Sequence, residues 1–218
     1  MKIVNQRVSE SFAKILEAKK DRVRSGKYNP SSFGRCFRNQ YWNRKNEAVT
    51  NPADLKGLKR MQRGTYSHNM IQSHFEPDEV EKRIELPDVL GFADIVLDDC
   101  VIDLKFTDDY LYSRFWKVPT EDIIRDKRES CYQVVFYAMM LQKEKAILRG
   151  SRFLDFVGVE HDVYNALIVE EVQSELNELR RIWDKQELPE AKPRAFGGKD
   201  CNFCNWADKC KEVENEGK

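Results

Sequence analysis

Two aspartates and a lysine stand close together in two short segments that are otherwise apolar. Asp94 ends the sequence Gly-Phe-Ala-Asp, and Asp103 and Lys105 enclose Leu104 in Asp-Leu-Lys. Carboxylate oxygens bind hard cations such as Mg²⁺ and Mn²⁺, and an ammonium group can stabilise the charge that develops when a phosphodiester is attacked. These residue types indicate metal-dependent hydrolysis of a phosphodiester.

The segments that carry these residues are predicted to be neighbouring strands. Three segments are rich in Val, Ile, Leu and Phe, namely residues 80–87, 90–97 and 100–106. If Asp98-Asp99 is a two-residue turn, Asp94 lies opposite Asp103, where two like charges are unfavourable unless something positive lies between them. Lys105 falls on the same face as Asp103 because side chains alternate along a strand. The other face is apolar and is expected to pack into a core (Ile95, Ile102 and Leu104).

A histidine on a predicted helix could join this group. Apolar residues recur at helical spacing over residues 58–75 and place His68 on the inward side (Leu58, Met61, Ile71 and Phe75). A lone histidine on such a side is more often a packed core residue than a ligand. For the whole group, the alternative to a metal site is a β-hairpin with solvated carboxylates and a surface lysine.

Two further polar residues share the face of a second predicted helix. Gln133 and Tyr137 stand four positions apart in the sequence ESCYQVVFYAMML, so their side chains lie one above the other. This spacing suits a helix that presents two polar tips to a substrate along the edge of a site. The alternative is a tyrosine that packs its ring in the core and a glutamine without a role.

Three of the six cysteines form a compact motif near the C-terminus. Cys201, Cys204 and Cys210 have the spacing C-x2-C-x5-C, which is typical of a metal site. Such a site needs a fourth thiolate, and no second pair lies nearby, so the fourth ligand must come from far away in the sequence. Cys36 is the best candidate, and Cys100 and Cys131 are interpreted as ordinary reduced thiols.

The net charge is zero, but the charges are unevenly distributed. Residues 1–60 hold 15 Lys and Arg against 5 Asp and Glu, residues 61–110 hold 4 against 12, and residues 111–218 hold 18 against 20. A basic segment commonly binds phosphate backbones, although two ordinary solvated faces would give the same distribution. We therefore expect residues 1–60, which begin with a predicted helix over residues 9–25, to bind nucleic acid.

Aromatic side chains interleave with cations directly after Lys105. Residues 107–122 contain four aromatic residues and two cations (Tyr110, Tyr112, Phe115, Trp116, Arg114 and Lys117). Such a segment could stack the bases and hold the phosphates of a single strand. Alternatively, its aromatic rings pack back onto the core.

Length and composition limit the class of protein. The 218 residues are 41% hydrophobic and 34% charged, the mean hydropathy is −0.68, and no stretch approaches the ~18 consecutive apolar residues of a membrane helix. Charged and polar residues precede any apolar run of signal-peptide length. We expect a single domain in the cytoplasm, without a membrane partner.

Together these motifs resemble the RecB-like branch of the PD-(D/E)XK nuclease superfamily. The motifs that carry the resemblance are Gly64-x3-His68, Gly91-Phe92-Ala93-Asp94, Asp103-Leu104-Lys105 and Gln133-x3-Tyr137, bracketed by Cys36 and by Cys201, Cys204 and Cys210. In this order they are most similar to the iron–sulfur exonuclease family associated with CRISPR spacer acquisition, whose relatives include AddB-type helicase–nuclease domains. The resemblance covers the chain from about Cys36 to Cys210.

The resemblance implies a fold and the roles of individual residues. The fold would be a restriction-endonuclease-like α/β core, a mixed sheet flanked by helices, with an iron–sulfur-stapled helical subdomain. Mg²⁺ or Mn²⁺ would be bound by His68, Asp94, Asp103 and the carbonyl of Leu104. Lys105 would be the catalytic lysine, acting with both aspartates, and Gln133 and Tyr137 would complete the site.

The resemblance also implies that Cys36, Cys201, Cys204 and Cys210 hold a [4Fe-4S] cluster. Structural Zn²⁺ is the chief alternative, because four thiolates suit both metals. Within one domain we expect a basic helical DNA-binding part over residues 1–60, a nuclease core over residues 61–185, and a linker with the cysteine motif over residues 186–218.

The implied activity is a metal-dependent DNA exonuclease acting on single-stranded ends, in CRISPR spacer acquisition or in recombination and repair. The chain contains no P-loop, so a partner would have to supply any unwinding. The expected partner proteins are an integrase or a helicase. Two alternatives remain: a nucleic-acid-binding or partner-recruiting iron–sulfur module with a weak or inactive site, and a structure-specific endonuclease of the same fold.

The sequence departs from the family pattern at one position and leaves another open. Many relatives have Glu where this chain has Asp103, which shortens the carboxylate by one methylene and could alter metal preference. A further acidic ligand sometimes comes from the preceding strand, where Glu81 and Glu85 both qualify.

Overall fold

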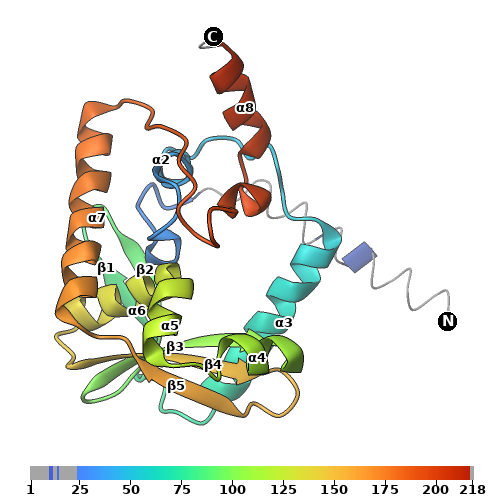
Figure 1. The fold of residues 1–218 in the computed structure, drawn as a ribbon, viewed down its shortest axis with the longest axis vertical. Coiled ribbons are helices and arrows are strands. Elements are labelled where there is room, and N and C mark those ends of the chain that lie inside the picture. The colour runs from blue at the N-terminus through green and yellow to red at the C-terminus, as the bar shows by residue number, and fades with distance from the viewer. Residues whose placement is uncertain (1–9, 12–13, 15–23, 217–218) are drawn as a thin grey trace.

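The computed structural model describes residues 10, 11, 14 and 24–216 (Figure 1). The helix predicted over residues 9–25 lies almost entirely outside the described residues. The elements up to the crossover are η1 (Pro30–Ser32), α2 (Phe37–Arg44), α3 (Leu55–Gln72), β1 (Val80–Glu85), β2 (Leu90–Val96) and β3 (Cys100–Thr107). They are followed by α4 (Asp109–Phe115), α5 (Thr120–Asp126), α6 (Arg128–Met140), β4 (Lys145–Arg152), β5 (Gly158–Asp162), α7 (Ala166–Lys185), η2 (Asp200–Phe203) and α8 (Ala207–Glu216).

The five strands form one mixed sheet in the order β1-β2-β3-β4-β5. Strands β3 and β4 are parallel, and every other neighbouring pair is antiparallel. Because parallel neighbours need a crossover, α4, α5 and α6 all lie between β3 and β4 in the sequence. The prediction of a mixed α/β sheet flanked by helices is therefore confirmed.

The hairpin that carries the two aspartates has the predicted register. Ile95 pairs with Ile102 and Val96 with Val101, and Leu97 N donates to Cys100 O at 2.9 Å. This is the ladder expected from a two-residue turn at Asp98-Asp99. The ladder of paired residues ends at Ile102, so the predicted pairing of Asp94 with Asp103 does not form.

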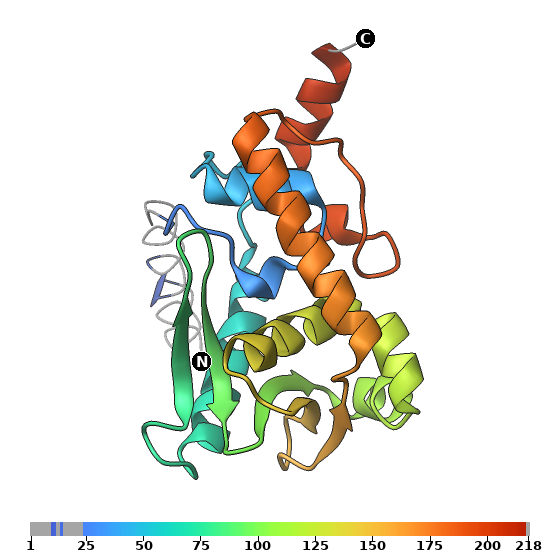
Figure 2. The same cartoon turned by 90° about the vertical axis from the view of Figure 1, so that its left-hand side faces the viewer.

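Helices cover both faces of the sheet. On one face, Ala93, Val101, Ala146 and Leu148 pack in a large core with side chains of α6 and α7. On the other face, Ile95, Ile102 and Leu104 form a smaller core against Ile71 of α3 and Phe75. Figure 2 shows α3 behind the strands, with α6 and α7 on the side nearer the viewer and to the right. The predicted apolar face of Ile95, Ile102 and Leu104 is confirmed.

Helix α3 differs from its prediction at one end and on one side. It spans Leu55–Gln72, so Phe75 follows the helix and packs from the loop. Leu58 is buried as expected, but Met61 is 50% exposed, so its predicted inward position is wrong. The first half of α3 extends beyond the sheet (Figure 1), so Met61 does not pack against it.

The segment around Cys36 consists of two short helices separated by a turn. Asn29 caps the short helix η1, the chain then turns, and α2 begins only after Cys36, which is its N-cap residue. Gly34 interrupts the helix with a φ of +76°, a conformation that side chains disfavour. Its N–H donates to Glu175 at 2.8 Å instead of to a helical carbonyl.

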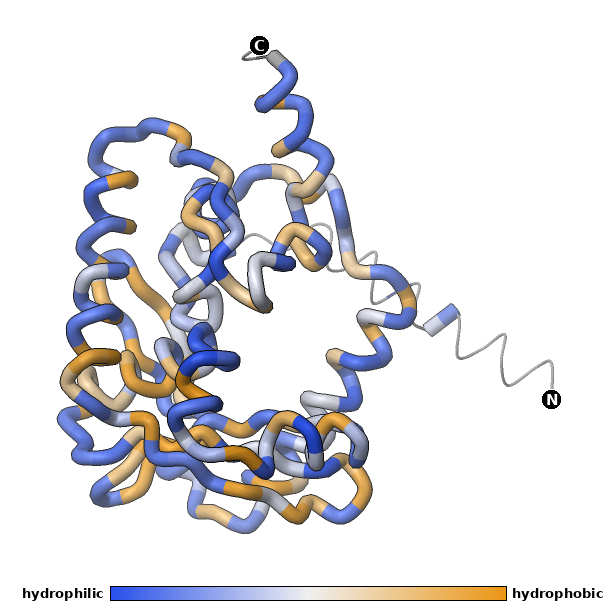
Figure 3. The backbone as a smooth tube through the Cα atoms, in the orientation of Figure 1, coloured by the Kyte–Doolittle hydropathy of each residue, from blue (hydrophilic) through white to orange (hydrophobic). Residues whose placement is uncertain are grey.

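The described N-terminal segment is part of the main core. Tyr28 and Phe33 are buried in the same apolar core as α6 and α7, and Tyr28 forms a parallel bridge to Val89. The C-terminal helix α8 extends from the body and is coloured largely as hydrophilic in Figure 3. Within the described part of the chain, no helix has the length and apolar character needed to span a bilayer.

Candidate active site

Asp94 joins two strands through its side chain. Beyond the Ile95–Ile102 pair, β2 no longer forms a backbone ladder with β3. There, Asp94 Oδ2 accepts a hydrogen bond from Leu104 N at 2.7 Å. The carboxylate therefore takes the place of a backbone acceptor, and this holds it against β3 beside Asp103.

Asp103 and Lys105 form an ion pair on the predicted common face of β3, in which the carboxylate is buried and the lysine side chain is 32% exposed. Asp103 is 1% exposed, and Lys105 Nζ lies 2.7 Å from its Oδ2. This oxygen is shielded from solvent. Although it lies close to the ammonium, the geometry of the pair is not that of a hydrogen bond. The oxygen thus retains capacity to accept a further positive ligand.

His68 approaches the group from α3. Its Nδ1 lies 3.5 Å from Asp94 Oδ2, and its ring packs against Phe106 with the ring centroids 5.4 Å apart. The side chain retains 26% exposure. His68 is therefore a partly solvated residue at the edge of the site, not a fully packed core histidine.

The electrostatics of the three residues are linked. Burial, with a contribution from Asp94, raises the pKa of Asp103 to about 6, although Lys105 opposes this. Burial alone would lower the pKa of Lys105, but Asp103 and Asp94 outweigh it and the pKa is raised. Burial alone would also lower the pKa of His68. The contact of His68 with Asp94 outweighs this effect, so the pKa of His68 is raised. Lys105 thus stays charged at neutral pH.

The two predicted residues of α6 lie at different depths. Gln133 Oε1 accepts from Lys105 Nζ at 3.4 Å, so Gln133 belongs to the site. Tyr137 is 2% exposed, and burial followed by the nearby Asp103 and Asp94 raises the pKa of its hydroxyl. A Cβ at Gly91 would lie only 2.5 Å from that hydroxyl. Tyr137 is therefore packed behind the aspartates, and Gly91 leaves room for it.

Of the two glutamates on β1, only Glu81 lies beside Asp94. Strand β1 pairs Val80 with Ile95 and Lys82 with Ala93, which places Glu81 alongside Asp94. Gln72 was not recognised in the sequence, yet its Nε2 donates both to Glu81 Oε1 at 2.8 Å and to the carbonyl of Asp94 at 2.9 Å. Its position directly after Ile71, one of the predicted inward residues of the helix, was the only available signal.

Glu85 lies at the other end of β1, where it forms ion pairs with Lys27 and Arg83. It pairs across the strands with Leu90 and not with the residues around Asp94. These contacts direct the carboxylate away from the two aspartates. Glu85 is thus not part of the site.

The donors at the site suit a hard divalent cation in kind. They comprise two carboxylates, one with a buried oxygen that lacks a hydrogen bond, and one imidazole. Across the residues that the structure describes, no three His, Cys, Asp or Glu side chains are close enough together to hold a metal ion. Asp103 pairs with the Lys105 ammonium instead, so metal binding would require these side chains to move closer together.

The four cysteines expected to form one site line one cavity. A cavity of about 380 Å³ is bordered by Cys36, Cys201, Cys204 and Cys210, and we call it the cysteine cavity. All four thiols are free. Burial, then Asp200 and the three other cysteines, raise the pKa of Cys201. The structure thus brings Cys36 to the C-terminal motif. Among the described residues, however, the cysteine sulfurs do not lie close enough together to hold a metal ion.

Three N–H groups point at the cysteine sulfurs. Asn39 Nδ2 and Trp206 N donate to Cys204 Sγ at 3.2 and 3.4 Å, and Arg38 Nη1 donates to Cys210 Sγ at 3.3 Å. Such donors stabilise thiolates and are among the groups that adjust iron–sulfur centres. The donor set therefore fits a thiolate-bound metal or cluster.

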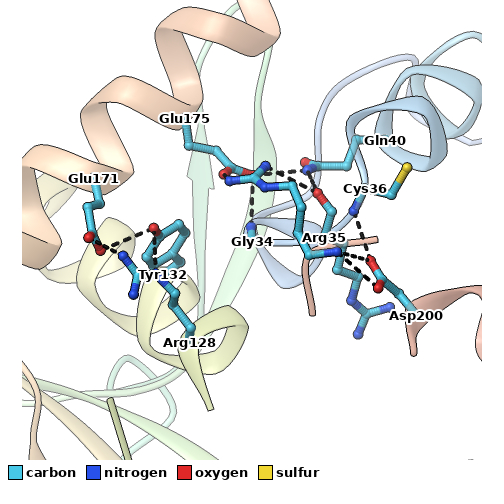
Figure 4. Close-up of polar contacts among 10 residues, drawn as sticks. Gly34, Arg35, Cys36, Gln40, Arg128, Tyr132, Glu171, Glu175 and Asp200 are labelled. Atoms are coloured by element: carbon cyan, nitrogen blue, oxygen red, sulfur yellow. Dashed lines mark hydrogen bonds and ion pairs between the residues drawn. The ribbon is translucent and has the colours of Figure 1, made fainter. Parts of the chain in front are cut away.

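Two carboxylates join the segment around Cys36 to the C-terminal part of the chain (Figure 4). Glu175 of α7 is 3% exposed and accepts from Gly34 N, Gln40 Nε2 and Arg194 Nη2 at 2.8, 3.0 and 2.6 Å. Asp200 accepts from Cys36 N and Arg194 N, each at 3.1 Å. We call these contacts the carboxylate network.

The carboxylate network was not expected from the sequence. The signal that could have revealed it is Glu175 itself, a charged residue on the apolar side of α7 among Val172, Leu176 and Leu179. All three of those neighbours are buried. A glutamate in such a position needs buried hydrogen-bond or ion-pair partners, because a buried carboxylate without partners destabilises the fold.

The aromatic residues after Lys105 lie in and next to a helix, and each of the two interpretations holds for some of them. Two of the rings pack onto the core and two are exposed. Tyr112 and Trp116 are buried in the core, whereas Tyr110 is 69% and Phe115 37% exposed on α4. Arg114 Nη1 donates to Tyr110 OH at 2.9 Å. Only Tyr110 and Phe115 are thus available to a ligand.

No protein-family model and no curated protein matches this sequence. Among solved structures, the chain is similar to that described as the crystal structure of SSO0001, with a TM-score of 0.56 and 16% identity over 94% of this chain and 96% of that one. It also matches an alkaline exonuclease (LHK-Exo) from Laribacter hongkongensis, with a TM-score of 0.44 and 17% identity over 75% of this chain and 92% of that one. The likeness to SSO0001 shows a shared fold over nearly the whole of both chains.

Proposed function

We propose that this chain is a metal-dependent deoxyribonuclease that digests DNA from single-stranded ends. One observation carries the proposal: Asp94, Asp103, Lys105 and His68 come from three elements and meet at the point where β2 leaves β3. Placing two carboxylates together, one of them buried, costs free energy unless their charges are used or compensated. The motifs that resemble RecB-like nucleases supply these same four residues.

In this proposal Asp94, Asp103, His68 and the carbonyl of Leu104 would hold Mg²⁺ or Mn²⁺. The metal would polarise the scissile phosphate and lower the pKa of a bound water. Glu81 is a further candidate, because it lies alongside Asp94 and shares Gln72 with it.

Lys105 provides the positive charge at the reacting phosphate. Its ammonium is held by Asp103 and by Gln133 Oε1, so it is oriented before substrate binds. A raised pKa keeps it protonated, and it can donate a hydrogen bond to the attacking water or to the phosphoryl oxygens as negative charge develops. Gln133 positions Lys105, and Tyr137 supports the strand that carries Asp94.

The preference for single strands rests on exposed aromatic and basic groups beside the site. Tyr110 and Phe115 on α4 follow β3 directly, with Arg114 next to both. Aromatic rings can stack on unpaired bases but not on bases within a duplex. The proposal includes an integrase or helicase partner, in CRISPR spacer acquisition or in recombination and repair.

The proposal also places a [4Fe-4S] cluster in the cysteine cavity, with a structural role. Four free thiols surround this cavity and three N–H groups point at their sulfurs. A cluster there would cross-link Cys36 to the C-terminal motif and hold the N-terminal segment against the core.

The test compares digestion of linear and circular single-stranded DNA, with Mg²⁺ or Mn²⁺, by anaerobically purified wild type and the Asp103→Asn variant. We expect wild type to digest the linear strand only, and Asp103→Asn to lose on the order of a thousandfold in rate. Asp99→Asn is the matched control, since Asp99 is an exposed residue of the same hairpin that pairs with Lys145. It should retain wild-type activity.

Each other result has a defined meaning. Cleavage of the circle would identify an endonuclease. If folded, metal-supplied wild type leaves both substrates intact but binds the linear strand, the chain is a binding module and the proposed function is wrong.

A further inference from the structure

A second cavity lies directly beside Lys105. It has a volume of about 370 Å³, within the range of small-ligand sites, and we call it the lysine cavity. Three cations, three hydroxyl groups and one carboxylate line it, namely Arg35, Lys105, Lys127, Ser31, Thr107, Ser130 and Glu129, so the positive charges outnumber the negative one. Such a lining suits the phosphate of a nucleic acid strand, which is recognised by cations and hydroxyls.

Arg35 differs from the other two cations in how it is held. Its carbonyl accepts from Gln40 Nε2 and Arg194 Nη1 at 3.1 and 3.3 Å. The backbone on either side is fixed by the carboxylate network, through Gly34 N to Glu175 and Cys36 N to Asp200. The main chain at Arg35 is therefore fixed by contacts from α2, α7 and the C-terminal segment.

The guanidinium of Arg35, in contrast, has no carboxylate partner among the described residues. Its Nε is buried without a hydrogen bond, and Figure 4 shows no contact from this group to the other residues drawn. Its recorded interaction is with the ring of Phe196, whose centroid is 5.3 Å away. A buried donor without a partner is costly, and a bound ligand would supply the missing acceptor. The rigid backbone thus holds the guanidinium of Arg35 in place for a ligand.

Phe196 provides an exposed ring next to this cation. It is 38% exposed, it lines the lysine cavity, and Phe203 packs against it edge-on with the centroids 5.7 Å apart. Its φ of +53° is unusual for a phenylalanine and costs free energy. Both Arg35 and Phe196 also border the cysteine cavity, so the pair forms the wall between the two cavities.

We propose that Arg35 and Phe196 form a nucleotide subsite beside the reacting phosphate. Arg35 pairs with the phosphodiester next to the one at Lys105, and Phe196 stacks on its unpaired base. The inference rests on the proposed function and deepens it, because it assigns the binding of the single-stranded DNA to two residues beside the cysteines. Lys127, whose Nζ lies over the rings of Phe115 and Trp116, borders the same path.

The test measures binding of a fluorescent single strand of about 15 nucleotides in EDTA, so that no cleavage occurs, at several salt concentrations. The full-length protein is compared with Arg35→Gln, Arg35→Lys and Phe196→Leu. None of these changes removes the Arg35 carbonyl, so the backbone contacts remain and unfolding temperatures should match wild type. Arg181→Gln is the control, because Arg181 is an exposed arginine paired with Glu178 on α7.

We expect Arg35→Gln to weaken binding about tenfold and to reduce the slope of log Kd against log salt by about 0.7, the value for one lost phosphate contact. Arg35→Lys should restore the slope. Phe196→Leu should weaken binding about fivefold or more without a change in slope. This loss should vanish for a strand without bases, and Arg181→Gln should bind as wild type does.

The failure of the subsite and of the proposed function can be told apart by a parallel cleavage assay with metal. If wild type cleaves and Arg35→Gln has the wild-type affinity or salt slope, the subsite is wrong and the nuclease assignment stands. The same holds if Phe196→Leu weakens base-free and normal strands equally. If wild type neither binds nor cleaves single strands, the proposed function and the subsite fail together.

Discussion

At the scale of single residues, the most informative contact is that between Asp94 and Leu104 N. The contact lets two strands separate while a carboxylate keeps them in register. As a result, Asp94 and Asp103 can lie near each other without the direct cross-strand pairing that would oppose two like charges. The hairpin pattern predicted that the two aspartates would be neighbours, but not that a side chain would complete the pairing.

The raised pKa of Asp103 predicts proton-linked metal binding. Because a protonated carboxyl is a poor ligand, protonation of Asp103 alone should lower the affinity for Mn²⁺ about fivefold between pH 6 and pH 5. His68, whose pKa is also raised, should add to the slope. Isothermal titration of Mn²⁺ between pH 5 and 8 measures this. An affinity that is flat between pH 5 and 6 would contradict it.

The same shift affects stability without metal, in the opposite direction. Asp103 binds a proton more readily when folded than when unfolded, where its pKa is near the ordinary 3.8. Its contribution to stability is therefore complete below about pH 4 and lost as the pH rises through about 6. Compared with Asp103→Asn, wild type should lose stability over this window in thermal unfolding with EDTA.

At the scale of elements, the strands of the site were predictable and the turn at Gly34 was not. Alternating apolar residues and a two-residue turn are local signals in the sequence. They were therefore sufficient to predict β2, β3 and the register between them. The break between η1 and α2 depends on Gly34 reaching Glu175, which lies 141 positions away. Met61 was misplaced for a similar reason, because periodicity cannot show how far a helix extends beyond its sheet.

Two glycines provide a matched prediction about these elements. Gly150 of β4 pairs with Lys105, and a Cβ there would lie 1.9 Å from the buried ring of Trp116. Gly150→Ala should therefore destabilise the fold by about 3 kcal/mol. A Cβ at Gly64 of α3 would meet nothing within 4 Å. Gly64→Ala should thus stabilise by about 0.5 to 1 kcal/mol.

Urea unfolding of the two glycine variants beside wild type measures both changes. Equal stabilities for Gly150→Ala and wild type would mean that Trp116 can move aside. A loss of stability in Gly64→Ala would mean that the open space beside α3 is not free in solution.

At the scale of the whole molecule, the N-terminal and C-terminal parts are joined at several places besides the cysteines. Thr50 N and Asn51 N both donate to Asn205 O, at 3.0 and 2.9 Å, and Trp206 Nε1 donates to Glu47 O at 3.2 Å. The spacing of the cysteines predicted that distant segments meet. It could not reveal these contacts, because every one of them is accepted by a backbone carbonyl, which any sequence provides.

Removal of one cysteine tests the cross-link in the cysteine cavity. Cys36→Ser should lose the bound metal or cluster and, by analogy with a disulfide that closes a long loop, destabilise the protein by on the order of 4 kcal/mol. Cys100→Ala is the control, since Cys100 lies in β3 outside the cavity. Metal analysis, visible absorption and thermal unfolding report the result. Unchanged metal content in Cys36→Ser would refute the four-cysteine site.

The carboxylate network has a consequence for synthesis on the ribosome. Cys36 emerges early, but its partner Asp200 follows 164 positions later. At about 5 to 20 residues per second this delay is roughly 10 to 30 s. The complete network can fix the segment around Gly34 only after both Glu175 and Asp200 have been made, whereas β2 and β3 precede both of them in the sequence. The wall between the two cavities can therefore form only after the strands of the active site.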